Sequence, residues 1–302
     1  MKIQLGINTG FALNRYTAPE QWIPLVAETF GLRLVQFTAD LLNPSLPDDI
    51  IAAQLPKIQG LLADYGVRVA HTFTSAFTRV NHLSHPDPAI RAYWVDWFGR
   101  FARISAALGA ESMGSHFGIL TVPDLADPAV RAERFQQNID GWHQIAAMAA
   151  NEGLHYLTWE PMSLPREYGE TLAETRRIHT AVNQDSPLPF KLCLDVDHGD
   201  VASANPDDTD PYAWIREFAR EAPIIHLKQT SANKHGHWPF APEYNKNGRI
   251  TPEKLLTALA AAGVEQVTLL LELSFRERQP YEDRLIDDII ASIEYWLPFV
   301  SI

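Results

Sequence analysis

The amino-acid sequence predicts an α/β fold of the (β/α)8-barrel class. Short apolar runs rich in β-branched residues recur along the chain, and a longer amphipathic stretch follows each of them. Eight such pairs fill the 302 residues. Alternation of strand and helix at this spacing favours a parallel sheet with crossover helices. Eight units in a chain of this length favour a closed barrel over a doubly wound sheet.

The expected strands are apolar runs bounded by turn-forming residues. In chain order they are Ile3–Asn8, Leu34–Thr38, Arg68–Thr72, Ser112–His116, Leu154–Glu160, Phe190–Asp195, Ile224–Gln229 and Val267–Leu273.

The expected helices are stretches with apolar residues at helical spacing, such as Trp22, Val26 and Phe30 in the first. In order they cover Pro19–Phe30, Ile50–Tyr65, Ile90–Leu108, Val130–Asn151, Thr171–Val182, Pro211–Arg220, Pro252–Ala261 and Tyr281–Leu297. Glycines precede several expected strands, where helices commonly end.

The sequence shows no linker, low-complexity tract or short repeat, so we expect one catalytic domain over residues 1–302. The turn after the first strand, Gly6-Ile7-Asn8-Thr9-Gly10, lacks the GxGxxG spacing of dinucleotide-binding folds.

Composition narrows the class of protein. Hydrophobic residues make up 46% of the chain, which predicts a sizeable core. The net charge of −12 disfavours a nucleic-acid partner. Cys193 is the single cysteine, which excludes an intramolecular disulfide and fits a reducing compartment. The first residues do not resemble a signal peptide, and no run approaches the roughly 20 apolar residues of a membrane span. We therefore expect a cytoplasmic protein without a membrane partner.

Reactive side chains fall at the ends of six successive expected strands, where barrels of this class place their chemistry. They are His71, His116, Glu160, Asp195 (followed by His198), His226 and Glu272. Because the strands converge around one axis, we expect these side chains to share a cavity. Carboxylates together with imidazole suit Mn, Mg, Co or Zn. Two carboxylates from strands across the barrel can also approach opposite faces of a bound substrate.

The carboxylates also have a structural interpretation. Glu160 and Glu272 lie in apolar strands, where a carboxylate is costly unless it is paired, so structural ion pairs are the alternative. Asp195 competes with Asp197 and Asp200, one of which can cap the following turn. We favour Asp195 because it stands nearest the apolar strand.

The histidines have a structural interpretation as well. His226 can be a hydrogen-bonded core histidine. His71 and His116 can be hydrogen-bond partners of other site residues and need not touch a ligand.

The ordered set of Glu160, Asp195 with His198, His226 and Glu272 resembles the xylose-isomerase-like TIM-barrel superfamily. That group includes sugar-phosphate isomerases and epimerases, ketose 3-epimerases and type IV apurinic endonucleases. The likeness covers nearly the whole chain. In ketose 3-epimerases the corresponding residues bind one divalent metal ion, and the two glutamates exchange protons beside the carbonyl. The resemblance therefore implies Glu160, Asp195, His226 and Glu272 as metal ligands, with Glu160 and Glu272 as the catalytic pair.

The resemblance also implies the substrate. Residues 5–12 and 35–44 are similar to the tetrulose-phosphate (erythrulose phosphate) epimerases or isomerases of erythritol and threitol breakdown. His198 matches a substrate-contacting histidine, and Gly248-Arg249-Ile250 resembles a loop whose arginine contacts the sugar. In the endonucleases an Asp-x-His in this loop helps to hold three zinc ions, whereas this chain has Asn247-Gly248-Arg249. That departure weighs against DNA repair.

The implied reaction is proton transfer at C3 of a keto sugar phosphate through an enediolate. An aldose–ketose isomerase would use the same metal and intermediate, and the sequence does not separate the two. A metal-dependent phosphodiesterase and a non-catalytic sugar-binding protein are rival hypotheses of lower rank. Acidic barrels of this type commonly associate, so a homo-oligomer is compatible with the sequence.

Basic residues follow the seventh and eighth expected strands, where barrels usually bind phosphate. They are Lys228, Lys234, His235, His237, Lys246, Arg249, Arg276 and Arg278. The alternative is that several are solvated loop charges. Trp238 follows His237 in a loop that suggests a lid, with packing as the alternative. The expected substrate contacts are His71, His116, His198, Lys228, Arg249 and Trp238.

Overall fold

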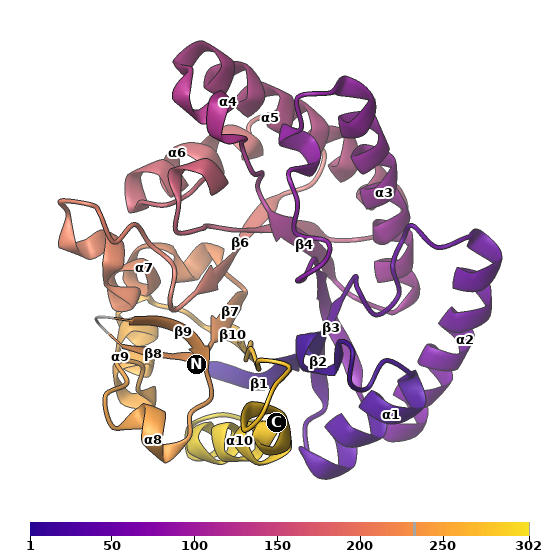
Figure 1. Cartoon of the computed structure of the whole chain (residues 1–302), viewed down its shortest axis with the longest axis vertical. Coiled ribbons are helices and arrows are strands. Elements are labelled where there is room, and N and C mark those ends of the chain that lie inside the picture. Colours follow the sequence, from indigo (N-terminus) through magenta and orange to yellow (C-terminus); the bar gives the residue numbers. More distant parts are fainter. Residues whose placement is uncertain (232–233, 302) are drawn as a thin grey trace.

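The computed structural model describes residues 1–231 and 234–301, and the side chains of Lys234 and His235 lie outside the described part. Eight parallel strands close into a barrel, and helices surround them (Figure 1). In barrel order the strands are β1 (Lys2–Asn8), β10 (Gln266–Leu271), β7 (Ile224–Leu227), β6 (Phe190–Asp195), β5 (Tyr156–Glu160), β4 (Ser112–His116), β3 (Arg68–Phe73) and β2 (Leu34–Thr38). The predicted (β/α)8 barrel is confirmed.

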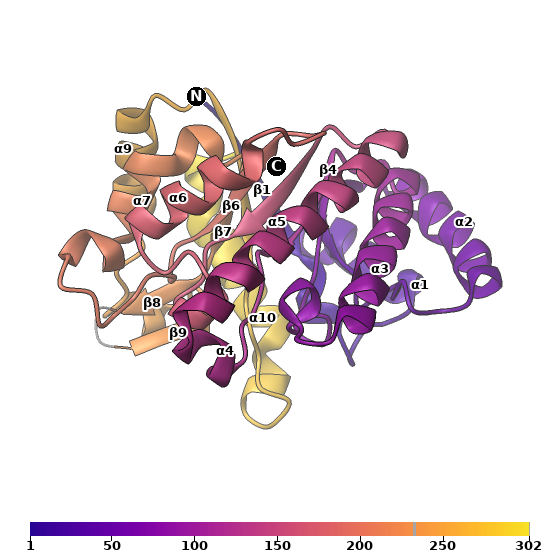
Figure 2. The same cartoon turned by 90° about the horizontal axis from the view of Figure 1, so that it is seen from above.

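The principal helices run along the outside of the strands, as Figure 2 shows for α3 and α5. They are α1 (Pro19–Pro24), α2 (Asp48–Tyr65), α3 (Pro88–Ala107), α5 (Pro128–Asn151), α6 (Leu172–Asn183), α7 (Pro211–Phe218), α9 (Pro252–Ala262) and α10 (Tyr281–Trp296). Two short helices, α4 (Val122–Ala126) and α8 (Pro242–Asn245), were not predicted.

Local signals in the sequence explain where the helices begin and end. Asp87 and Asp127 each accept a hydrogen bond from a backbone N–H of the first turn, and a proline follows in each case. Gly66 and Gly263 end α2 and α9 with φ of 63° and 71°, in the left-handed region that favours glycine.

The core lies mainly between the strands and the surrounding helices. It includes four fully buried tryptophans: Trp22, Trp142, Trp159 and Trp296. Among the described residues, none of the helices combines the length and the apolar character that crossing a membrane requires.

The seventh strand is shorter than the sequence predicts. β7 ends at Leu227, and Gln229 begins a hairpin of β8 (Gln229–Ser231) and β9 (Lys234–Trp238) that was not predicted. The Gln229 side chain donates to Asn245 Oδ1 at 2.8 Å and to the Ile250 carbonyl at 3.0 Å. These bonds tie the hairpin to the loop that follows it. β10 likewise ends at Leu271, so Glu272 stands one residue beyond the barrel sheet.

Candidate active site

Four adjacent strands bring the predicted metal ligands together. Glu160 and Asp195 are the last residues of β5 and β6, His226 lies within β7, and Glu272 follows β10. One ligand atom from each of these four residues lies within 4.8 Å of the others. The register of β6 and β7 places Asp195 directly opposite His226. We call this group the carboxylate ring.

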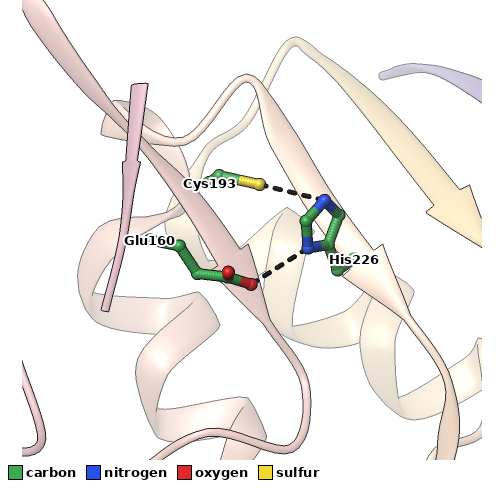
Figure 3. A group of neighbouring side chains, drawn as sticks. All are labelled: Glu160, Cys193 and His226. Atoms are coloured by element: carbon green, nitrogen blue, oxygen red, sulfur yellow. Dashed lines mark hydrogen bonds and ion pairs between the residues drawn. The ribbon is translucent and has the colours of Figure 1, made fainter. Parts of the chain in front are cut away.

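His226 lies at the centre of the carboxylate ring. Its Nδ1 atom is 3.0 Å from Glu160 Oε1 and 3.5 Å from Glu272 Oε2. Figure 3 shows the opposite edge of the imidazole facing Cys193, whose Sγ is 3.3 Å from Nε2. Burial alone would lower the pKa of His226, but Cys193 and the carboxylates of Glu272 and Glu160 together outweigh it and raise that pKa well above its usual value. Without a metal, the imidazole therefore holds two protons. Nδ1–H donates to Glu160.

A chain of buried hydrogen bonds sets which nitrogen of His226 faces the ring. The Gly10 N–H donates to Asn8 Oδ1 at 2.7 Å, which turns the Asn8 amide so that its Nδ2 donates to Gln36 Oε1 at 2.7 Å. The same Gln36 oxygen accepts from His226 Nε2 at 2.8 Å. The Nε2 proton therefore stays on the Gln36 side, and Nδ1 is the nitrogen that can give its lone pair to a metal.

Lys228 is fully buried and forms ion pairs with Asp195 and with Glu272, the latter at 2.9 Å. Burial would lower its pKa, but Asp195, Glu272 and Glu160 raise it above the usual value, so the amine stays charged. The structure thus places this predicted substrate contact inside the ring. The pKa of Glu272 lies well below its usual range. Burial raises this pKa, but the nearby charges of His226 and Lys228 lower it by more.

The donor set of the ring fits a divalent cation. Three carboxylates and one imidazole nitrogen match the ligands that Mn, Mg, Co and Zn accept, as the sequence predicted. The three carboxylates and the Lys228 ammonium sum to a formal charge of −2 (−3 + 1), which such an ion would balance.

The ring opens into a cavity of about 550 Å³ whose lining includes Glu160, Glu272, His116 and His198. His198 Nδ1 donates to the Pro161 carbonyl at 2.8 Å, which leaves Nε2 for other partners, 3.8 Å from Asp195. His116 Nε2 donates to the Val80 carbonyl at 2.9 Å. Both predicted substrate contacts therefore stand beside the ring, and each is held by a backbone oxygen.

The other four predicted contacts, Lys228, His71, Arg249 and Trp238, are not among the described residues that line this cavity. His71 lies two residues before the end of β3, with Nδ1 2.8 Å from Ser112 Oγ inside the barrel. Arg249 bonds the Thr209 carbonyl at 2.8 Å and lies 3.6 Å from Asp197.

Trp238 lines a neighbouring cavity and stacks on Tyr244 with ring centroids 5.6 Å apart. The two cavities share His237, Ser274 and Phe275 in their linings.

Several site residues were missed by sequence reasoning. Asn8 and Gln36 fall in the two segments that carry the family likeness, yet neither is a typical ligand or acid–base group. The usable signal was Gln36 itself, a polar residue inside an apolar strand. Arg79 and Glu167, which also line the cavity, follow β3 and β5 in loops with no distinguishing pattern.

Comparisons with known proteins agree with this geometry. The profile of the xylose isomerase-like TIM barrel family matches residues 24–295. The D-erythrulose 1-phosphate 3-epimerase of Brucella abortus (strain 2308) is 43% identical over 304 residues, which cover 100% of this chain and 97% of that protein.

Solved structures share the fold. A protein from Rhodospirillum rubrum ATCC 11170, provisionally described as a xylose isomerase, is 26% identical with a TM-score of 0.87, over 99% of this chain and 100% of that one. The D-psicose 3-epimerase of Clostridium cellulolyticum H10, solved with D-tagatose, is 16% identical with a TM-score of 0.73, over 99% and 100% of the two chains. With the barrel and the sequence match in agreement, this chain belongs to the xylose isomerase-like TIM barrel family.

Proposed function

We propose that the protein is a divalent-metal-dependent 3-epimerase of a tetrulose 1-phosphate, such as D-erythrulose 1-phosphate, in sugar or polyol breakdown. One observation carries the proposal: Glu160 and Glu272 flank the same nitrogen of His226, at 3.0 and 3.5 Å, and both line one cavity. The full-length similarity to a D-erythrulose 1-phosphate 3-epimerase supports this substrate class.

Glu160, Asp195, His226 Nδ1 and Glu272 would hold the metal ion. When bound, the ion would supply Lewis-acid polarisation of the C2 carbonyl and stabilise the negative charge of an enediolate. Lys228, buried against Asp195 and Glu272, holds these two carboxylates in place through its ion pairs.

The two glutamates move the protons. One carboxylate takes the proton from C3, the electrons of the C–H bond form the C2–C3 double bond, and the carbonyl electrons pass to O2. The other glutamate must enter this turnover protonated, with a proton taken up from solvent. It gives that proton to C3 from the opposite face, the C2 carbonyl is restored, and the two glutamates have exchanged protonation states. Because Glu160 and Glu272 come from strands separated by β6 and β7, they can approach the substrate from two sides. His198 Nε2 is available to a substrate oxygen.

The test is proton NMR of D-erythrulose 1-phosphate in D2O with the metal-loaded enzyme. We expect deuterium to enter at C3. Because C3 is the only stereocentre of this sugar, its epimer is the mirror image, and its formation is followed by the decay of the circular dichroism of the carbonyl band. EDTA should stop both changes until Mn or Co is restored. Label on a different carbon would instead indicate the aldose–ketose isomerase. Tight metal binding without any C–H exchange would indicate a sugar-binding protein.

A further inference from the structure

A substrate phosphate needs a cation that the carboxylate ring does not provide. With a divalent ion bound, the formal charge of −2 on the ring and Lys228 is balanced, so the centre offers little net attraction to a phosphate dianion. Lys228 is itself fully buried between Asp195 and Glu272. In a 1-phosphate, only C1 and one oxygen separate C2 from phosphorus, so the cation must stand in the same cavity.

Two arginines line the described part of that cavity, Arg15 and Arg79. The Arg15 side chain is only 10% exposed, and its Nε and Nη2 donate to Glu282 at 2.8 to 3.0 Å. Nη2 also donates to the Phe275 carbonyl at 3.1 Å. Most of its donors are therefore committed, and its charge is matched by one carboxylate.

Arg79 differs from Arg15 in both its exposure and its partners. Its side chain is 41% exposed, and in the described part of the chain it forms one ion pair, with Glu167. The Glu167 side chain is 9% exposed and also accepts from Arg166 Nη2 at 3.3 Å. Two guanidinium groups thus share one carboxylate, which leaves this cluster of three residues with a net charge of +1 (+2 − 1). Arg79 can leave Glu167 without stranding a buried carboxylate, because Arg166 remains.

The backbone beside Arg79 is tied to the reaction centre. The next residue, Val80, accepts the hydrogen bond of His116 Nε2 at 2.9 Å. His116 in turn pairs in register with Glu160 on the neighbouring strand, and adjacent strands lie about 4.8 Å apart. Arg79 therefore approaches the cavity from the β4–β5 side of the ring, next to the proposed catalytic glutamate.

We propose that Arg79 binds the phosphate of the substrate, exchanging the Glu167 carboxylate for two phosphate oxygens in a bidentate contact. The inference rests on the proposed function and assigns the phosphate to the loop after β3. It differs from the expectation from the sequence, because Arg276 and Arg278 line cavities that do not include Glu160. His237 does line this cavity, but its imidazole already contacts Lys228 and Glu272. Lys246 is exposed and lines none of the cavities that are described.

The experiment compares kcat/KM for erythrulose 1-phosphate and for free erythrulose in the metal-loaded wild type, Arg79→Gln and Arg79→Lys. Loss of one charged bidentate contact should lower kcat/KM for the phosphorylated substrate by roughly 10- to 100-fold. The value for free erythrulose should change by less than about twofold. Arg79→Lys should fall between wild type and Arg79→Gln, because it keeps the charge without the paired donors. Guanidinium ions added to Arg79→Gln should restore part of the loss.

Arg103→Gln is the control, since Arg103 also pairs with a single glutamate, Glu152 at 3.4 Å, but lies outside the described cavity lining. It should leave both substrates unchanged. Equal losses on both substrates in Arg79→Gln would overturn the inference. So would a selective loss in Arg276→Gln or Arg278→Gln that Arg79→Gln does not show.

Inorganic phosphate separates this inference from the proposed function. If the wild type exchanges C3–H of neither sugar, the proposed function is wrong, and phosphate titration followed by 31P NMR still decides the role of Arg79. Binding by wild type that weakens at least tenfold in Arg79→Gln supports the subsite, and equal binding removes it.

Discussion

The two halves of the barrel differ in the kind of polar group that they present. Strands β5, β6, β7 and β10 carry or precede three carboxylates, an ammonium and a raised-pKa imidazole. Strands β1 to β4 carry neutral polar groups at the ends that face the site, among them Asn8, Gln36 and His116. Burial holds the pKa of both His71 and His116 at about 3, so these imidazoles are uncharged. The charged half can hold a cation and move protons, while the neutral half fixes the orientation of groups in the charged half.

Gln36 is where the two halves meet. It lies on β2, is fully buried, and joins Asn8 of β1 to His226 of β7 across the barrel interior. Removing a charged ligand should therefore abolish function, whereas removing the neutral partner should weaken metal binding and spare the proton chemistry itself.

The largest expected effect is in the charged half. Glu160→Gln and Glu272→Gln should each lower kcat by about 10³-fold or more, because each removes one proton-transfer group. The fold should persist, as circular dichroism would show. Metal affinity measured by isothermal titration calorimetry separates a loss of proton transfer from a loss of metal binding. Glu133→Gln, at an exposed carboxylate that is 61% accessible, is the control and should be neutral. Near-normal rates in both active-site variants would contradict the mechanism.

The next largest effect is expected at Gln36, where the two halves of the barrel meet. Gln36→Leu should weaken metal binding by roughly 10- to 100-fold, because His226 Nε2 loses its acceptor. It should also cost about 1–3 kcal/mol of stability, since buried donors on Asn8 and His226 are left unpaired. Gln36→Glu keeps an acceptor and should retain most of the affinity. Nitrogen-15 shifts of His226 in the protein loaded with diamagnetic Mg or Zn report directly which nitrogen keeps its proton. If all three proteins bind metal equally, the hydrogen-bond chain has no such role.

The barrel and a set of six reactive strand ends could be predicted from local patterns, and the family resemblance narrowed those six to the four ring residues. Strand–helix alternation fixes the fold class, and a charge at the end of an apolar strand marks a position that must be paired. The Asn8–Gln36–His226 contacts depend on residues 28 and 190 positions apart, which no local pattern brings together. The many basic residues after the seventh and eighth strands suggested a phosphate site there. Their number along the sequence does not show which arginine lies in the cavity with N–H donors that can bind a ligand.

A smaller effect is expected on the stability of the protein at acidic pH, through the buried His82. Burial lowers the pKa of His82 well below its usual value, and the His116 charge would lower it further. The folded protein thus leaves His82 unprotonated where the unfolded chain takes up a proton, so stability falls as pH drops below about 6.5. His82→Asn, which tolerates the φ of 30° at this position, should reduce that fall by about 1.4 kcal/mol per pH unit. Urea unfolding of metal-free protein from pH 7.5 to 5.0 measures it. Parallel curves for variant and wild type would refute it.

The smallest effect should come from Cys193. Its thiol lies 3.3 Å from His226 Nε2, but burial raises its pKa to about 11, so it stays neutral. Because Gln36 is the better acceptor, Cys193→Ser should change metal affinity by less than about threefold. A loss as large as that of Gln36→Leu would make sulfur the principal partner of the imidazole.

Gly10 touches none of the four ring residues, yet a Cβ atom there would meet Asn8 Oδ1 at 2.9 Å. Any larger residue would push on the amide whose orientation is passed through Gln36 to the imidazole. Gly10 also lines the cavity, so it is a natural target for engineers who wish to broaden the range of sugars accepted. Libraries at this position would change cation loading together with selectivity, and screening them at a single fixed metal concentration would confuse the two.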